Sequence, residues 1–258
     1  MNSKKTFQKQ KNVLSRKKIT DEKIANGKAL KKFQYEFISS TSHQLRTPIA
    51  SIQSSLDVLE LYINKGNPAR QKEVLGKIKK SISGLRDTLE RVTILYKNEL
   101  VKPKLNIQKL EPHKFFNDLL DELMIASNET CLININFEIA EKHIYADEFI
   151  LKQILLNLVN NAIKFSNKEG QIRLLIKSQK NNILVSIKDE GIGIEKKDMK
   201  NLFRPFYRGS NASLIPGDGL GLAIVKKLCT IHKIKIELTS EPNKGAEFIL
   251  TIPQKRNQ

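Results

Sequence analysis

The chain of 258 residues carries 45 Lys and Arg against 27 Asp and Glu, a formal net charge of +18, and it has no tryptophan. With 40% hydrophobic residues, it can bury the core of one large or two small domains, built mainly from Leu, Ile and Val. The lysines are scattered, with one local cluster at residues 4–32, which favours a solvated surface over specific nucleic-acid binding. No apolar run reaches about 18 residues, so we expect no membrane span. Cys131 and Cys229 lack metal-ligand spacing and favour a reducing, cytoplasmic location.

The first half of the chain predicts a polar arm followed by a helical hairpin. Residues 1–32 are lysine-rich and are consistent with either a frayed helix or a disordered arm. Apolar residues then recur every seven positions in two interleaved sets, which is the seam of a packed helix: Ile38, Leu45, Ile52 and Leu59, with Ile49, Leu56 and Ile63. The sequence Lys65-Gly66-Asn67-Pro68 ends this helix, and a second seam runs from Leu75 to Tyr96. One hairpin buries only part of these stripes, so we expect a homodimer that forms a four-helix bundle.

The second half predicts a domain of mixed helix and strand. Val101–Lys104 is typical of a linker, which sets the expected domains at 33–100 and 107–254, with a linker at 101–106 and a tail at 255–258. We predict helices at 112–127, 147–166, 195–203 and 219–233, and strands at 131–139, 171–178, 183–188, 235–239 and 247–252. Several strands are adjacent in sequence, so the expected fold is an α/β sandwich with a mixed sheet covered by helices.

His43 lies in the segment SHQLRTP of the first helix. The heptad pattern places it on the flank of the helix, facing water. Pro48 lacks an N–H and clashes with the carbonyl group of Gln44, so the helix is expected to bend or loosen there. A lone histidine on a polar helix face is usually an ordinary surface residue, and only the motifs that follow favour a functional one.

The segment LKQILLNLVNNAIKFSNKEG, at residues 151–170, predicts a helix with two different faces. Leu151, Leu155, Leu158 and Ala162 form an apolar stripe, while Asn157, Asn161 and Lys164 form a polar one. Asparagine is a poor helix former, so two on one face favour a role other than stability. Amide oxygens suit Mg²⁺ and an ammonium group suits phosphate.

Two glycine-rich segments follow. In DEGIGI, Asp189 ends a predicted strand, where its carboxylate can accept a hydrogen bond from an amino group, and Gly191 and Gly193 allow close approach of a ligand. In GDGLGL, glycines precede an apolar helix, whose first N–H groups and positive dipole end suit phosphate: Gly217, Gly219 and Gly221. Between them, LFRPFYRG and the small polar residues after it predict a lid, from which Arg208 reaches a terminal phosphate.

Taken in this order, the segments resemble the core of a bacterial sensor histidine kinase of a two-component system. SHQLRTP is similar to the H-box of that family, LNLVNNAIKFS to its N-box, DEGIGI to its G1 box, LFRPFYRG to its F-box and GDGLGL to its G2 box. The resemblance covers residues 33–254. It implies a dimeric helical hairpin followed by an ATP-binding domain of the GHKL type, with ATP and Mg²⁺ bound by the latter.

The resemblance also implies a role for each matching residue. His43 accepts the γ-phosphate of ATP, Gln44 stands at the position beside it, and Thr47 helps orient water for dephosphorylation of a partner response regulator. Asn157 and Asn161 lie by the phosphates, with Asn161 the expected Mg²⁺ ligand. Lys164 and Arg208 contact phosphate, Phe165 lines the adenine side and Asp189 binds the adenine amino group. The segments with Gly191, Gly193, Gly217, Gly219, Leu220 and Gly221 shape the site and the hinge of its lid.

The implied partners are a response-regulator receiver domain, a second copy of the chain, and an upstream sensor or signalling protein of unknown identity. The chain is then either the cytosolic part of a membrane receptor or a soluble kinase that takes its signal from a partner. Three other functions compete with the kinase. A response-regulator phosphatase or scaffold with weak kinase activity is one, another GHKL ATPase is disfavoured by the hairpin, and a nucleic-acid binder requires a localised basic surface.

Gln44 departs from the family pattern, because the family usually has Glu or Asp after the phosphorylated histidine. The amide cannot take the imidazole proton, and general-base assistance typically contributes about 10²–10⁴-fold. A neutral imidazole still has a lone pair on one ring nitrogen. We therefore predict slow autophosphorylation that Gln44→Glu accelerates in a single-turnover assay with ATP. An unchanged rate in the variant would contradict this role for residue 44.

Overall fold

The computed structural model describes residues 38–96, 104–127, 132–167, 170–212, 215 and 217–254. The predicted arm at 1–32, the first half of the predicted linker at 101–106 and the tail at 255–258 lie outside these residues. The chain divides into two compact units, Met1–Thr88 and Leu89–Gln258, which are taken one at a time below. Among the described helices, none combines the length and apolar character that crossing a bilayer needs.

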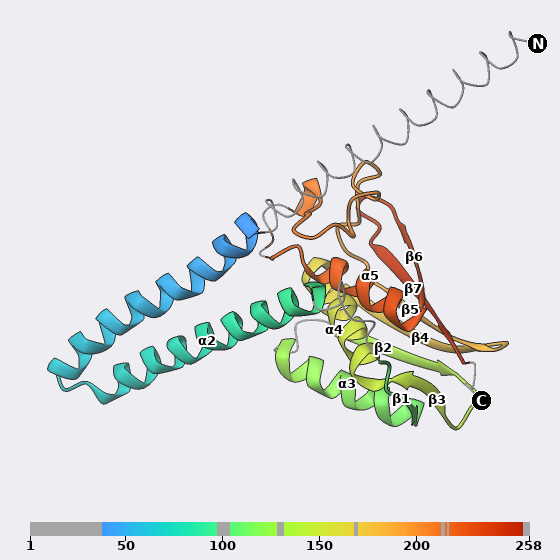
Figure 1. Cartoon of the computed structure of the whole chain (residues 1–258), viewed down its shortest axis with the longest axis horizontal. Helices are drawn as coiled ribbons and strands as arrows, with labels where there is room; N and C mark the ends of the chain where they lie inside the picture. The colour runs from blue at the N-terminus through green and yellow to red at the C-terminus, as the bar shows by residue number, and fades with distance from the viewer. Residues whose placement is uncertain are drawn as a thin grey trace, which may run out of the picture. The chain divides into compact units, whose positions relative to one another are not determined.

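The first unit contains most of the predicted helical hairpin, up to Thr88. The first hairpin helix covers residues 38–64 of the described chain, and α2 (Pro68–Tyr96) runs back beside it in Figure 1. Gly66 adopts a φ of +62° in the turn, and the N–H of Asn67 donates to the carbonyl oxygen of Tyr62 at 3.1 Å. Asn67 then caps α2, because its Oδ1 accepts from the N–H of Arg70 at 3.2 Å. The predicted turn is therefore confirmed.

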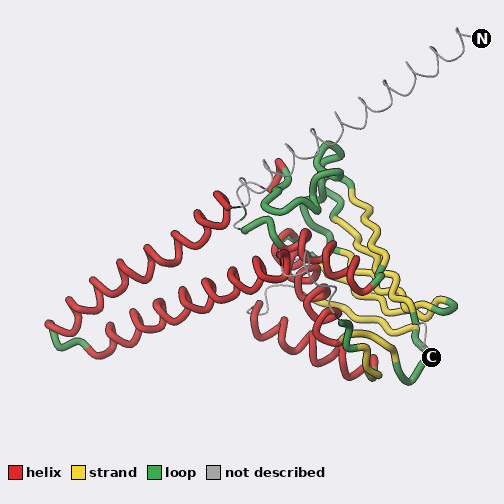
Figure 2. Tube along the Cα trace, viewed as in Figure 1, coloured by secondary structure: helices red, strands yellow, loops and turns green. Residues whose placement is uncertain are grey.

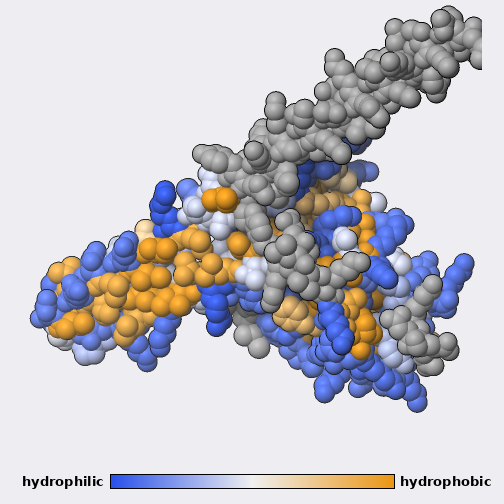
Figure 3. Space-filling view, viewed as in Figure 1, coloured by the Kyte–Doolittle hydropathy of each residue, from blue (hydrophilic) through white to orange (hydrophobic). Residues whose placement is uncertain are grey.

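The apolar residues of the hairpin divide into a covered set and an uncovered set. Val74 and Ile78 of α2 are buried, and Ser51 and Ser81 approach each other across the hairpin, with 3.3 Å between their Oγ atoms. The uncovered set repeats every seven residues on each helix and is between 44% and 56% exposed: Ile49, Leu56 and Ile63, then Leu75, Ile82 and Leu89. Figure 3 shows apolar side chains gathered along this face. One chain alone leaves this surface in water.

The second unit contains two sheets, drawn in yellow in Figure 2. A small antiparallel sheet pairs β1 (Ile107–Leu110) with β3 (Ile144–Asp147). The large sheet has the order β2-β4-β5-β7-β6, in which β2 and β4 are parallel and every other pair is antiparallel. Its strands are β2 (Leu132–Glu138), β4 (Gln171–Gln179), β5 (Asn182–Lys188), β6 (Lys235–Ser240) and β7 (Ala246–Pro253). The predicted mixed sheet is confirmed.

Three helices cover one face of the large sheet: α3 (Pro112–Ser127), α4 (Glu148–Phe165) and α5 (Gly221–His232). Burial alternates along β4 and β7, so every second side chain points under the helices. Between the layers lies one hydrophobic core, in which Phe116 from α3, Leu155 from α4 and Val185 from β5 are fully buried. Val92, Ile94 and Leu95, at the end of α2, pack against the same core.

Three local features differ from the expected elements. The short strands β1 and β3 were not predicted, since four residues carry too little alternation to stand out. The helix predicted at 195–203 is wrong, because this segment forms successive turns. The N–H groups of Asp198, Asn201 and Arg204 donate to the carbonyl oxygens three residues earlier, without the continuous ladder of a helix.

A buried network joins the start of α4 to the end of α5. Asp147 caps α4, since its Oδ1 accepts from the N–H of Ile150 at 3.1 Å and its Oδ2 accepts from the N–H of Asn106 at 2.9 Å. The N–H of Asp147 donates in turn to Nε2 of His232 at 2.9 Å. Because Nε2 is the acceptor, the neutral ring carries its proton on Nδ1. Burial lowers the pKa of His232, and nearby Asp147 opposes that shift only in part.

This lowered pKa predicts a pH-dependent stability. The unfolded histidine takes up a proton near pH 6.5, whereas folded His232 stays neutral to lower pH, so the free energy of unfolding falls as the pH drops below about 6.5. The loss reaches at most about 1.4 kcal/mol for each pH unit between the two pKa values. His232→Gln keeps an acceptor and removes the titration. Urea unfolding at pH 7 and pH 5 measures the difference.

The matched control is His143→Gln, which alters an exposed histidine outside the network. We expect the control to show the pH dependence of the native chain and His232→Gln to show less. Equal pH dependence in all three proteins would mean that His232 does not couple protonation to folding.

Candidate functional site

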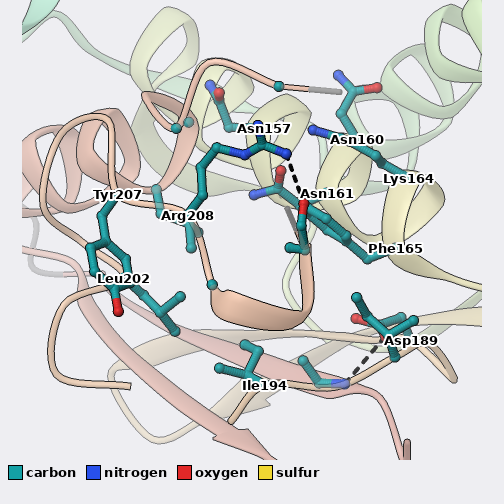
Figure 4. A pocket seen from close by; sticks show the side chains of 18 of the residues that line it. Asn157, Asn160, Asn161, Lys164, Phe165, Asp189, Ile194, Leu202, Tyr207 and Arg208 are labelled. Carbon is teal, nitrogen blue, oxygen red and sulfur yellow. Dashed lines mark hydrogen bonds between the residues drawn. The ribbon is translucent and has the colours of Figure 1, made fainter. Parts of the chain in front are cut away.

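A cavity of about 300 Å³ opens between α4, the loop after β5 and the segment that leads into α5. Figure 4 shows its lining side chains, with the polar residues of α4 and Arg208 at one end and Asp189 at the other. The walls between them are largely apolar and include Ile194, Leu202 and Phe248. The cavity thus combines an apolar middle with two chemically different ends, as ligand sites commonly do.

Asp189 is the buried acid of the site. Its Oδ1 accepts hydrogen bonds from the N–H of Gly191 at 2.9 Å and from the N–H of Ala246 at 3.2 Å, which fix the side chain at the end of β5. Only 6% of the residue is exposed, and burial raises the pKa of its carboxyl group while these two N–H groups oppose the shift. A second carboxylate oxygen, Oδ2, remains to accept from a ligand donor.

Glycines make the floor beside Asp189 possible. A Cβ on Gly191 would lie 2.1 Å from the carbonyl oxygen of Phe165, and one on Gly193 would lie 2.0 Å from that of Glu241. Gly193 also has a φ of +63°, which disfavours other residues. Gly191 does not line the cavity itself. Its close contact with α4 sets the distance between Asp189 and Phe165, and both of these residues line the cavity.

The opposite end is built from α4. Leu151, Leu155 and Leu158 bury one face of the helix, so Asn157, Asn161 and Lys164 on the other face line the cavity. The side-chain amide of Asn157 donates to the carbonyl oxygen of Gln153 at 2.7 Å, which leaves its Oδ1 toward the start of α5. There, a Cβ on Gly221 would lie 3.2 Å from Oδ1 of Asn157 and within 3.9 Å of both amide atoms of Asn161.

This arrangement fits a divalent cation bound together with a phosphate. Two amide side chains converge next to Gly221, and Mg²⁺ commonly takes only one or two protein oxygens while phosphates and waters complete its shell. Asn161 and Asn157 are the residues that would hold it. Within the described residues, no cluster of three or more His, Cys, Asp or Glu side chains offers another metal site.

Positive charge gathers at the same end. Burial lowers the pKa of Lys164, and the neighbouring guanidinium groups of Arg208 and Arg91 lower it further, while Asp218 opposes the shift. Lys164 also lies 4.9 Å from the centroid of the Phe165 ring. Crowded cations of this kind favour an anionic ligand, because each lowers the cost of burying the negative charge.

The start of α5 supplies backbone donors. Gly219 has a φ of +69°, and a Cβ there would meet the backbone of Phe206 at 2.7 Å. Leu220 is fully buried and does not line the cavity, so it anchors the turn, while Gly221 and Leu222 of the first turn line the site. The N-terminus of α5 has no side-chain cap, and free N–H groups there suit phosphate.

The lid segment is fastened by Asp198, which sequence reasoning missed. Its carboxylate accepts from the hydroxyl of Tyr207 at 2.7 Å and from the N–H and Oγ of Ser210 at 2.7 and 2.9 Å. These bonds lower the pKa of Asp198, with the Ser210 N–H contributing most. They place Tyr207 and Arg208 on the cavity wall.

The cavity brings together most of the residues predicted from sequence for the second domain: Asn157, Asn161, Lys164, Phe165, Asp189, Gly193, Arg208, Gly217, Gly219 and Gly221. It adds polar residues that were not singled out: Arg91, Asn160, Tyr207, Asn211 and Asp218. Asn160 and Asp218 lie inside the quoted motifs, so their position in these motifs could have identified them from the sequence. Arg91 had none, because it belongs to the helical seam region far upstream.

The remaining predicted residues lie on the first hairpin helix. His43 is exposed, as the heptad pattern predicts. Thr47, also exposed, donates from its hydroxyl to the carbonyl oxygen of His43 at 3.4 Å. Gln44 is half-buried on the same turn. An exposed imidazole on a helix flank is open to a reacting group from outside the hairpin.

Two family models match this chain. Residues 33–100 match the His Kinase A (phospho-acceptor) domain, and residues 146–256 match the histidine kinase-, DNA gyrase B-, and HSP90-like ATPase. Together they cover well over half of the chain. The protein therefore belongs to the sensor histidine kinases and contains their two-domain core.

Curated relatives match most of this chain. The chain is 29% identical over 235 residues to the sensor protein RprX of Bacteroides fragilis, covering 89% of this chain and 45% of that protein. It is 30% identical over 260 residues to the circadian input-output histidine kinase CikA of Synechocystis sp., covering 96% of this chain and 35% of that protein. The chain thus spans about a third to a half of the length of these relatives.

Solved structures share the fold. The ShkA structure in complex with AMPPNP aligns with a TM-score of 0.64 at 24% identity, over 84% of this chain and 45% of that one. The histidine kinase ThkA in complex with the response regulator protein TrrA aligns with a TM-score of 0.63 at 22% identity, over 85% of this chain and 61% of that one.

The close contact at Gly191 yields a prediction. Gly191→Ala forces a Cβ against the backbone of α4, which must shift and move Asp189 away from Phe165. We expect a loss of about 1–3 kcal/mol in stability, as in other overpacked sites, and at least about tenfold weaker binding of AMP-PNP. Urea unfolding and calorimetric titration measure the two effects.

Gly209→Ala is the control, since Gly209 also lines the cavity but its nearest contact is the side chain of Asn211 at 3.3 Å. That side chain can give by a few tenths of an ångström. Equal damage from both substitutions would show that the backbone contact of Gly191 has no special importance.

Proposed function

We propose that this chain is the catalytic core of a two-component sensor histidine kinase. It binds ATP with Mg²⁺ in the cavity of the second unit, transfers the γ-phosphoryl group to His43, and passes it to an aspartate of a response regulator. The observation that carries the proposal is the cavity itself. A buried acid suited to an amino group lies at one end and a cluster of amides and cations suited to phosphate lies at the other.

The residues of the cavity account for nucleotide binding. Asp189 accepts a hydrogen bond from the adenine amino group, and the apolar wall with Ile194 and Phe248 covers the faces of the base. Lys164, Arg208 and the N–H groups at the start of α5 neutralise the phosphates. Mg²⁺, held through Asn161 with Asn157 beside it, supplies further charge neutralisation. The ShkA complex with AMPPNP supports this assignment at the level of the fold.

The transfer step forms a bond between an imidazole nitrogen of His43 and the γ-phosphorus. The bond from that phosphorus to the bridging oxygen of ADP breaks, and the imidazole proton leaves to solvent. Phosphoryl transfer requires mainly positioning and charge neutralisation, which the cations of the cavity provide. In the second step the N–P bond breaks and a carboxylate oxygen of the regulator takes the phosphoryl group.

The hairpin supports two partners. Its uncovered heptad face matches the surface of a second copy, which would complete a four-helix bundle and remove these side chains from water. The exposed flank with His43 and Thr47 is then the docking surface for a receiver domain. A structure of the histidine kinase ThkA, which shares the fold, contains the response regulator protein TrrA. In this proposal Thr47 also orients water when the regulator is dephosphorylated.

The test is incubation of the chain with γ-³²P-ATP and Mg²⁺, followed by acid and base treatment of the label. We expect acid-labile, base-stable label that is lost in His43→Ala, because a phosphorylated histidine hydrolyses in acid. His113→Ala is the control, since His113 stacks on Phe137 within the second unit, with 4.3 Å between ring centroids. Label that persists in His43→Ala would disprove the site. Bound ATP without any label would indicate a regulator phosphatase or scaffold instead.

A further inference from the structure

Arg91 links α2 to the phosphate end of the cavity. It lies near the end of α2, and the residues around it, Val92, Ile94 and Leu95, pack against the hydrophobic core of the second unit. Arg91 also lines the cavity, although it is far in sequence from every nucleotide-binding motif. The packing of its neighbours therefore holds a guanidinium group at the edge of the site.

The partner of Arg91 is Asp218, which lies between Gly217 and Gly219 in the turn that enters α5. Nη1 of Arg91 lies 2.6 Å from Oδ2 of Asp218, and the two side chains are 41% and 26% exposed. The other oxygen of Asp218, Oδ1, accepts from the N–H of Leu220 at 2.9 Å. Asp218 thus uses one oxygen to shape the phosphate-binding turn and the other to hold Arg91.

Asp218 is the anion among the cations of this end. It opposes the lowered pKa of Lys164, whereas Arg91 and Arg208 contribute to that lowering. A nucleotide brings several negative charges to the same place. Its phosphates repel the carboxylate and attract the guanidinium, whose planar fork suits phosphate oxygens.

We propose that Arg91 exchanges partners when a nucleotide binds, leaving Asp218 for a phosphate oxygen of the ligand. The ion pair with Asp218 and the contact with phosphate are then alternatives for one guanidinium group, and a bound nucleotide favours the second. Because Arg91 belongs to α2, this exchange couples nucleotide occupancy to the helix that also forms the hairpin. The inference rests on the proposed function, since it requires a nucleotide in the cavity.

The test is a double-mutant cycle with the full chain, titrated with AMP-PNP and Mg²⁺ and separately with adenosine, which has no phosphate. Arg91→Ala should weaken AMP-PNP binding about tenfold, the value of one charge-assisted hydrogen bond, and leave adenosine binding unchanged. Asp218→Asn keeps the acceptor for Leu220 and releases Arg91, so it should strengthen AMP-PNP binding. In the Arg91→Ala background, Asp218→Asn should have a clearly smaller effect, because only the repulsion between phosphate and carboxylate is then relieved.

Arg86→Ala is the matched control, because Arg86 lies upstream on α2 and its side chain is 79% exposed. We expect it to bind both ligands as the native chain does. Arg91→Ala that binds AMP-PNP normally would overturn the exchange while leaving the proposed function intact. Equal loss for adenosine would make Arg91 a structural residue only. If Asp218→Asn had the same effect without Arg91 as with it, Asp218 would act only by repelling phosphate and not by holding Arg91. No binding of AMP-PNP by the native chain would overturn the function as well.

Discussion

The functional site depends on the burial of one face of α4 against the large sheet. Leu151, Ile154, Leu155 and Leu158 have no exposed surface, and together they remove from water an area of apolar side chain that fixes the rotation of the helix. The opposite face is then turned toward the cavity, with its amides and ammonium group at the periodicity of the helix. The packing that stabilises the domain therefore also orients the residues that suit phosphate. A rotation of α4 would lower the stability and displace these residues.

The other end of the site is fixed by backbone contacts. Asp189 is held by two N–H groups, one from its own loop and one from β7, and the glycines around it let three chain segments meet without side chains. Gly245 belongs to this set, since a Cβ there would lie 1.9 Å from the carbonyl oxygen of Asp189. A buried carboxylate without these donors would be costly to keep charged. Asp189 and Gly245 thus form one unit, although they are far apart in sequence.

The sequence predicts what is periodic or carried by dense motifs, and it fails where a structure depends on distant partners. Repetitive apolar patterns predicted elements that the structure has: the seams of the hairpin, the helices at 112–127 and 147–166, and the strands of the large sheet. The turns at 196–203 were taken for a helix because the apolar spacing is helical, but Asp198 turns inward to hold Tyr207 and Ser210. His232 was not singled out from the sequence, since nothing local indicates its hydrogen bond to Asp147. The local sequence likewise does not indicate the contact of Arg91 with Asp218.

The position of Arg91 bears on how such a kinase core is controlled. α2 is one continuous helix, yet its last turns belong to the compact unit that holds the cavity, while its earlier turns belong to the hairpin. In the proposed exchange, nucleotide binding would act on α2 through Arg91, and a change in α2 would act on nucleotide binding in return. Reciprocity of this kind follows from linkage and needs no long pathway of residues. The glycine turn with Asp218 supplies the alternative partner that such an exchange requires.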